Sequence, residues 1–179
     1  TGDAVKCGMN EVKEAEKVLV LYGDVPLIKE KTLTELINSC NEGISILTTI
    51  LDQPYGYGRV KKDNDGNATA IIEEKDARDD EKNIKEIFTG VLCSQTDLLK
   101  EGLSKINNTN AAGEFYLTDI VSIMSNKGIK IKTHVASNNE VKGANSHSEL
   151  AELEGIYRSM KVQDILDMGI TVSDPSRLD

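Results

Sequence analysis

The segment Tyr22-Gly23-Asp24 combines an aromatic ring, a glycine and a carboxylate at the end of an apolar run. In open α/β sheets, ligands bind just beyond the carboxyl ends of parallel strands, so Asp24 could meet a ligand phosphate through a metal ion. One such carboxylate is sufficient for Mg²⁺, which keeps several waters and binds substrate phosphates directly. The same residues also suit an Asx turn, in which the Asp24 side chain bonds its own backbone.

Two further segments could contact a flat or hydroxyl-rich ligand. Gly56-Tyr57-Gly58-Arg59 has glycines on both sides of an aromatic residue, which lets the backbone approach a ligand closely. A glycine-rich turn before a hairpin strand gives the same pattern. In Glu73-Glu74-Lys75-Asp76-Ala77, a carboxylate could accept hydrogen bonds from sugar hydroxyls, and Lys75 could bind a phosphate. A solvated charged turn is the alternative for this run.

The fourth segment, Val141-Lys142-Gly143-Ala144-Asn145, precedes a long stretch with helical periodicity. Asn is a preferred residue at a helix N-cap, so Asn145 could cap that helix. Its side-chain oxygen would equally suit a hard cation. The residues alone leave both roles open, and the cation role requires that the fold place Asp24 nearby.

Composition restricts the classes of partner. The 179 residues are 39% hydrophobic and contain no Trp, so the core must be mainly aliphatic. A net charge of −9 argues against nucleic acid or an anionic membrane as a partner, whereas a nucleotide can still bind through a divalent metal and backbone N–H groups. Cys7, Cys40 and Cys93 form no CxxC pair, which is typical of reduced thiols in a cytoplasmic protein. No run has the length of a membrane span or the apolar centre of a signal peptide.

Periodicity predicts the elements that must position these residues. Apolar runs predict strands at 18–22, 44–51, 87–93, 129–135 and 170–172, the first of them buried on both faces. The Asp65-Gly66 pair between two strand-like runs predicts a hairpin. Helical spacing predicts helices over 3–16, 31–41, 97–106, 114–125 and 148–167. Strands alternating with helices, interrupted by one hairpin, indicate a mixed sheet covered by helices.

Taken in order, these segments resemble the uridyltransferase domain of bacterial bifunctional N-acetylglucosamine-1-phosphate uridyltransferase/glucosamine-1-phosphate acetyltransferase. The resemblance covers essentially the whole chain, and its most family-specific part is the block Ala-Gly-Glu-Phe-Tyr-Leu-Thr-Asp-Ile at 112–120. The other matching pieces are 21–27 (Leu-Tyr-Gly-Asp-Val-Pro-Leu), 56–59, 72–77, Thr89-Gly90, 143–145 and 174–177.

The resemblance implies an α/β, Rossmann-like nucleotide-diphospho-sugar transferase fold, with a mixed, mainly parallel sheet flanked by helices. It implies that residues 1–179 are a single partial domain, the C-terminal part of the nucleotidyltransferase domain. The N-terminal βα units, with the Gly-rich loop that holds the UTP phosphates, would precede Thr1. The hexapeptide-repeat β-helix of the acetyltransferase would follow Asp179.

The implied reaction is uridylyl transfer from UTP to N-acetylglucosamine 1-phosphate, which gives the cell-wall precursor UDP-N-acetylglucosamine and pyrophosphate. Positioning and charge neutralisation contribute most of the catalysis in such chemistry. By the family's pattern, Asp24 is the catalytic carboxylate and holds the cofactor Mg²⁺ together with Asn145. The implied substrate contacts are Tyr22 and Gly23 at the nucleotide, Thr1 at the uracil, Gly58 and Glu73 at the amino sugar, and Lys75 at a phosphate.

The chain departs from the family at Phe88, where the family has an Asn that hydrogen-bonds the sugar. A phenyl ring cannot supply that Asn's hydrogen bonds to the sugar. The isolated chain is expected to turn over weakly or not at all, because the phosphate-binding loop would precede Thr1. The implied partners are the two substrates and UDP-N-acetylglucosamine, with no nucleic acid and no membrane, and the parent enzyme would be a cytoplasmic homotrimer joined through the absent β-helix. The alternatives are another sugar-1-phosphate nucleotidyltransferase and a non-catalytic remnant that binds a nucleotide sugar.

Overall fold

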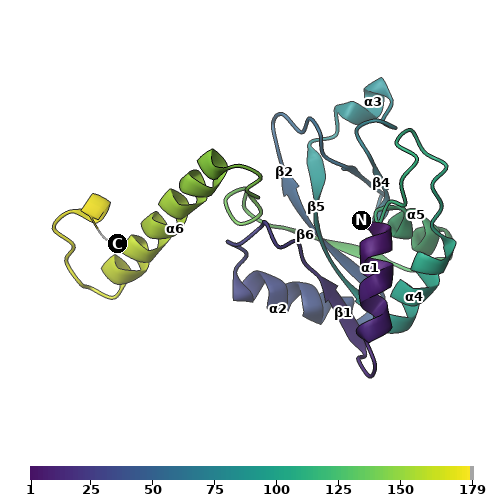
Figure 1. The fold of residues 1–179 in the computed structure, drawn as a ribbon, viewed down its shortest axis with the longest axis horizontal. Coiled ribbons are helices and arrows are strands. Elements are labelled where there is room, and N and C mark those ends of the chain that lie inside the picture. The colour runs from purple at the N-terminus through teal and green to yellow at the C-terminus, as the bar shows by residue number, and fades with distance from the viewer. Residues whose placement is uncertain (178–179) are drawn as a thin grey trace.

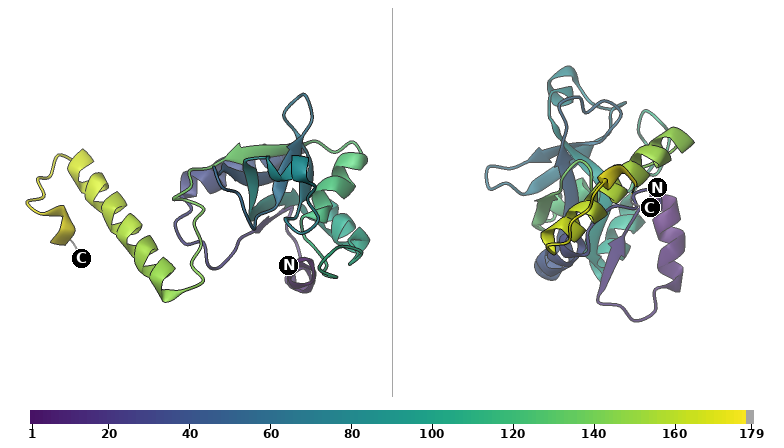
Figure 2. Two further views of the ribbon diagram at one scale, coloured as in Figure 1. Left: turned by 90° about the horizontal axis from the view of Figure 1, so that it is seen from above. Right: turned by 90° about the vertical axis from the view of Figure 1, so that its left-hand side faces the viewer.

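The computed structural model describes residues 1–177, except for the side chains of Glu42 and Ser176. A six-stranded sheet lies between helices, and one long helix projects from this body (Figures 1 and 2). The strands are β1 Lys17–Val20, β2 Ile44–Ile50, β3 Arg59–Lys62, β4 Ala68–Ile72, β5 Glu86–Gln95 and β6 Ile131–Val135. The α-helices are α1 Gly2–Gly8, α2 Glu30–Ser39, α3 Asp79–Lys82, α4 Thr96–Lys105, α5 Asp119–Asn126 and α6 His147–Asp167. Short 3₁₀ turns are Met9–Glu11, Cys40–Glu42 and Pro175–Arg177.

The strand order is β4-β3-β5-β2-β6, and β1 also pairs with β5. The α/β class and the mixed sheet are therefore confirmed. The expectation of a mainly parallel sheet is wrong for residues 1–177, because β2–β6 is parallel and the other four pairings are antiparallel. An apolar run indicates that a strand is buried on both faces but does not indicate its direction. Runs such as β2 therefore fit a parallel or an antiparallel sheet.

The predicted hairpin is confirmed as β3–β4. Gly66 adopts φ +83°, a conformation that glycine allows without strain from a side chain. The Asp63 carboxylate accepts hydrogen bonds from the backbone N–H groups of Asp65 (3.0 Å) and Asn67 (2.8 Å). The turn is thus held by local bonds and fixes the pairing of β3 with β4.

Two apolar cores cover the two faces of the sheet. Alternation along β2 sends Ile44 and Ile46 into a large core beneath α4 and α5, and Leu47 into a smaller core beneath α2. In β5, Phe88 and Leu92 join the large core, whereas Val91 and Cys93 join the small one. The central strands are thereby held rigidly, and the loops at their ends are the parts free to form a site.

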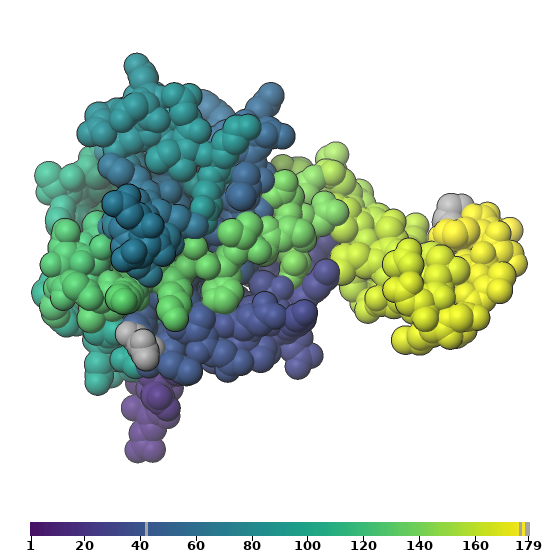
Figure 3. Space-filling model, turned by 180° about the vertical axis from the view of Figure 1, so that it is seen from behind, coloured from purple at the N-terminus to yellow at the C-terminus, as the bar shows by residue number. Residues whose placement is uncertain are grey.

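Several predicted boundaries change. The first helix ends at Gly8, and the helix predicted from residue 114 begins only at Asp119. All four residues of β1 are half-buried rather than buried on both faces, since this strand pairs only with β5. Residues 170–172 form no strand, because they follow α6, which stands away from the sheet (Figures 2 and 3). No helix in the described chain is both long and apolar enough to cross a membrane.

Candidate functional site

Asp24 and Asn145, 121 positions apart in the chain, are brought together at one open cavity of about 550 Å³. Asp24 lies in the loop between β1 and α2, and Asn145 lies in the segment between β6 and α6. The Ala144 N–H donates to the Asp24 carbonyl oxygen (3.0 Å). A Cβ on Gly143 would lie 3.4 Å from both the carbonyl and the Oδ2 of Asp24, so the two segments are in close contact. The proximity that a cation role for Asn145 requires is present.

The N-cap of α6 is Ser146, and Asn145 is the residue before it. The Ser146 hydroxyl accepts from the Glu149 N–H (3.2 Å), and the Glu149 carboxylate accepts from the Asn145 N–H (2.7 Å). The Ser146 side chain thus caps the helix, and the Glu149 carboxylate reaches back to the residue before the cap. Because Ser146 supplies the cap, the capping alternative for the Asn145 side chain does not hold. Asn145 lines the cavity together with Asp24.

Tyr22 extends the site from Asp24 toward β5. Its ring lies against Gly90, which has φ +90°, and a Cβ on Gly90 would be 2.4 Å from the ring. Burial raises the pKa of Tyr22, a hydrogen bond with Thr1 lowers it, and the charges of Glu73 and Asp24 raise it further. The phenol therefore stays protonated at neutral pH and lies near both carboxylates.

Gly58 and Glu73 lie side by side at the ends of β3 and β4. A Cβ on Gly58 would be 2.7 Å from Ile71 Cγ2, so a side chain there would collide with Ile71. The same Cβ would be 3.5 Å from Glu73 Oε2, so the position lies directly beside the carboxylate. The Thr118 hydroxyl donates to Glu73 Oε1 (2.8 Å), which orients the carboxylate. Thr118 is not among the residues predicted from the sequence to contact a substrate. The available signal was a hydroxyl beside a carboxylate in the run Tyr-Leu-Thr-Asp-Ile.

The Glu73 end of the site is strongly acidic. Burial raises the pKa of Asp119, and the charges of Glu73 and Asp76 raise it further. Burial likewise raises the pKa of Tyr116, together with the charges of Asp76 and Glu73. Such a group of carboxylates repels phosphate and accepts hydrogen bonds from hydroxyls and amides. Asp119 was also missed from sequence, where it was only one member of the family-specific block at 112–120.

Asp119→Asn should change how the melting temperature depends on pH. The folded protein holds the Asp119 proton more strongly than the unfolded chain does, so its contribution to stability is present below the unfolded pKa and is lost as pH rises through the folded pKa. The difference in Tm between the variant and the parent should therefore increase as the pH rises from 3 to 7. The increase should be only a few degrees, because solvent screens this half-exposed group. Differential scanning calorimetry measures it, with Asp97→Asn in the first turn of α4 as the matched control. A flat difference would contradict the prediction.

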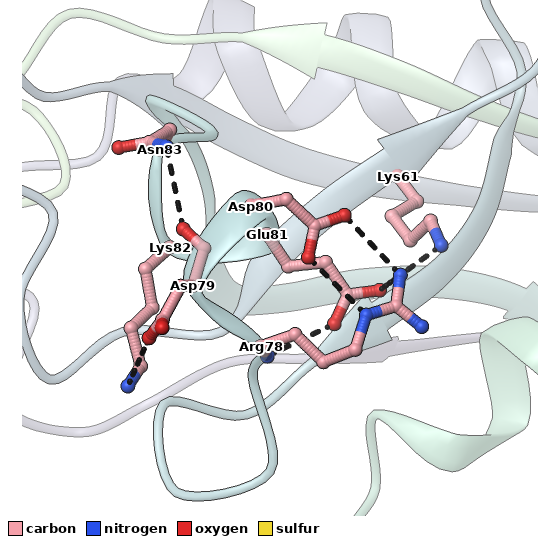
Figure 4. Close-up of polar contacts among 7 residues, drawn as sticks. All are labelled: Lys61, Arg78, Asp79, Asp80, Glu81, Lys82 and Asn83. Atoms are coloured by element: carbon pink, nitrogen blue, oxygen red, sulfur yellow. Dashed lines mark hydrogen bonds and ion pairs between the residues drawn. The ribbon is translucent and has the colours of Figure 1, made fainter.

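Three other groups contribute less to the site. Lys75 is exposed in the turn after β4, and no hydrogen bond or ion pair within residues 1–177 joins it to the other predicted residues. The Phe88 side chain packs in the large core, and its backbone N–H donates to Gly58 O (2.9 Å). The charged residues around α3 bond one another (Figure 4). The Glu81 carboxylate accepts from the Arg78 N–H (3.1 Å), a bond that caps this short helix, and it also accepts from Lys61 (3.1 Å).

Comparison with solved structures shows which proteins share this fold. The chain overlaps, over 87% of its length, with a Bacillus anthracis protein assigned as a glucose-1-phosphate thymidylyltransferase (TM-score 0.65, 18% identity, 60% of that chain). It also overlaps, over 88% of its length, with CMP:2-keto-3-deoxy-manno-octonic acid synthetase complexed with CTP (TM-score 0.59, 16% identity, 68% of that chain). At these identities the likeness establishes the fold.

Comparison of the amino-acid sequence with known proteins identifies more similar relatives than comparison of the fold does. No family model matches the chain. Proteins named Bifunctional protein GlmU match all of it, with 42% identity in Psychrobacter cryohalolentis, 41% in Dichelobacter nodosus and 43% in Francisella philomiragia. The chain spans about 40% of the length of these relatives. Over its whole length the chain is therefore a homologue of part of the bifunctional GlmU proteins, which confirms the resemblance carried by its motifs.

Proposed function

We propose that the protein containing this chain transfers a uridylyl group from UTP to N-acetylglucosamine 1-phosphate. The observation that carries the proposal is the contact between the Asp24 and Asn145 segments at one open cavity. The Tyr22 phenol lies near the charges of both Asp24 and Glu73, and Glu73 lies beside Gly58. The homology to GlmU proteins over all 179 residues supports it. In the reaction, a phosphate oxygen of the sugar phosphate attacks the α-phosphorus of UTP. The bond from that phosphorus to the bridging oxygen of the β-phosphate breaks, and pyrophosphate leaves.

The acidic end of the site is suited to the sugar. Glu73, oriented by Thr118, accepts a hydrogen bond from a sugar hydroxyl or amide, and Gly58 leaves room beside it. The nucleotide then lies toward Tyr22 and Thr1. The phosphates lie at the Asp24 cavity, away from the carboxylates around Asp119 that would repel them. This division keeps the reacting phosphates and the sugar ring in fixed relative positions, which is the main requirement of phosphoryl-type transfer.

The donors at the Asp24 cavity fit Mg²⁺. A carboxylate and an amide oxygen are hard ligands, and Mg²⁺ completes its octahedron with water and substrate phosphates. Within residues 1–177 no three or more His, Cys, Asp and Glu side chains gather into a metal-binding group. When bound there by Asp24 and Asn145, Mg²⁺ would neutralise charge that develops on the phosphates.

Properties of the whole protein extend beyond the chain. Within the chain, the phosphate contact of Lys75 stays a prediction. For the whole protein, four predictions remain: the homotrimer, the acetyltransferase β-helix, the cytoplasmic location and the role in making cell-wall precursors. The three free thiols are in keeping with a reducing compartment.

A pyrophosphate-release assay on the protein at its full natural length tests the proposal. We expect turnover with UTP, Mg²⁺ and N-acetylglucosamine 1-phosphate, and much less with CTP or dTTP. Phe88 makes glucose 1-phosphate the informative competing acceptor, because a phenyl ring buried in the core offers no hydrogen bond to an acetamido group. A higher kcat/KM for glucose 1-phosphate would establish the alternative acceptor. Binding of UDP-N-acetylglucosamine without any turnover would indicate a non-catalytic protein.

A further inference from the structure

Glu140 is a charged residue that is only 7% exposed, in the segment that connects β6 to Asn145. A buried carboxylate is costly unless its oxygens are hydrogen-bonded. Glu140 Oε1 accepts from the Lys29 N–H (3.1 Å) and from the Thr32 hydroxyl, and Oε2 accepts from the Ser137 hydroxyl (3.3 Å). Both oxygens are thus used, and two of the three donors belong to the start of α2.

The start of α2 has no side-chain cap of its own. Lys29 is the N-cap residue, and no side-chain cap bond is formed there. Glu140, which is 111 residues further along the chain, brings a negative charge to this end, where the helix dipole favours it. The carboxylate therefore ties the segment after β6 to the beginning of α2.

Both tied segments carry a candidate metal ligand. Asp24 lies five residues before Lys29, and Asn145 lies five residues after Glu140. The segments are joined a second time by the bond from the Ala144 N–H to the Asp24 carbonyl oxygen (3.0 Å). Two attachments, one at each end, fix the separation and the relative orientation of the segments. One attachment alone would leave them free to pivot.

We propose that Glu140 is a positioning residue, which holds Asp24 and Asn145 at the spacing that a divalent cation requires. The metal in this proposal rests on the proposed function. The two attachments, from Glu140 to the start of α2 and from Ala144 to Asp24, are a property of the fold and are called the clamp below. Groups that orient metal ligands from outside the coordination shell typically change metal affinity or activity by about 10–100-fold when they are removed.

The first test measures the clamp without activity. In Glu140→Ala, hydrogen exchange at the Ala144 amide should accelerate by at least about tenfold more than at core amides of β5, because the second attachment opens locally. Glu140→Gln keeps the shape and one acceptor oxygen and should show a smaller effect. Glu81→Ala is the matched control, since Glu81 is a 6% exposed carboxylate that caps α3 and is not part of the Asp24 cavity. Equal acceleration at Ala144 in both alanine variants would overturn the proposal.

The second test measures the metal. Mn²⁺ binding to the full-length protein with UDP-N-acetylglucosamine, followed by electron paramagnetic resonance, should weaken by about tenfold or more in Glu140→Ala and little in Glu81→Ala. Asp24→Ala separates the two hypotheses. If Asp24→Ala leaves Mn²⁺ binding unchanged, the proposed metal site is wrong. If Asp24→Ala abolishes binding while Glu140→Ala leaves both binding and Ala144 exchange unchanged, the positioning role is wrong.

Discussion

Replacing Asp24 with Asn should lower kcat for UDP-N-acetylglucosamine formation by at least about 100-fold, because the variant lacks the charged ligand of the Mg²⁺ that would neutralise the phosphates. Loss of one electrostatic contact that stabilises transition-state charge typically costs about 3–4 kcal/mol. Asn keeps the size of Asp, and the Asp24 carbonyl that bonds Ala144 belongs to the backbone, so the two loops should stay joined. The exposed side chain carries no packing, and Tm should therefore stay within about 2 °C of the parent value. Steady-state kinetics over a range of Mg²⁺ concentrations measures the effect.

Asp65→Asn is the control for this prediction, because it removes an exposed carboxylate from the turn of the β3–β4 hairpin. It should leave both kcat and the Mg²⁺ dependence unchanged. An Asp24→Asn variant that keeps more than about a tenth of the parent kcat at limiting Mg²⁺ would remove Asp24 from the metal role.

The second large effect is on stability, at Gly90. Alanine there combines two costs: a φ of +90°, which L-residues avoid, and a Cβ placed 2.4 Å from the Tyr22 ring. Backbone strain of about 1–2 kcal/mol and overpacking of about 1–3 kcal/mol should together lower the free energy of unfolding by about 3 kcal/mol. For a chain of this size that corresponds to a fall in Tm of about 6–12 °C. The displaced Tyr22 should also raise KM for UTP.

Two comparisons separate the causes. Gly66→Ala isolates the backbone cost, because Gly66 has φ +83° and nothing within 4 Å of its added Cβ. The double variant Tyr22→Ala/Gly90→Ala removes the collision, so it should lose less stability than the sum of the two single variants. Additive losses would show that the ring does not rest on Gly90 in solution.

The sequence was most informative where local chemistry decides the structure. Apolar alternation and the Asp65-Gly66 turn specified the strands and the hairpin, because these depend on neighbouring residues. Strand direction in the sheet was not predictable in this way, since β5 is paired by three strands from distant parts of the chain. Continuous apolar runs are compatible with either direction.

The candidate site shows the same limit. The motif residues Asp24, Tyr22 and Asn145 were found because their chemistry is visible in the sequence and their order matches a known family. Thr118 was missed because its role depends on meeting Glu73 across 45 positions. Whether Asn145 caps a helix could not be decided beforehand, since Ser146 beside it is an equally good cap and only the backbone conformation chooses between them.

The position of Asn145 next to a long projecting helix has a mechanical consequence. The 21 residues of α6 form a rod about 31 Å long whose inner end is fastened to the site through Ser146 and Glu149. A tilt of about 5° at the fastened end moves the far tip by nearly 3 Å, and a push on the tip returns to the fastened end as torque. A force on the outer end of α6 therefore acts on Asn145, the residue that lines the cavity with Asp24.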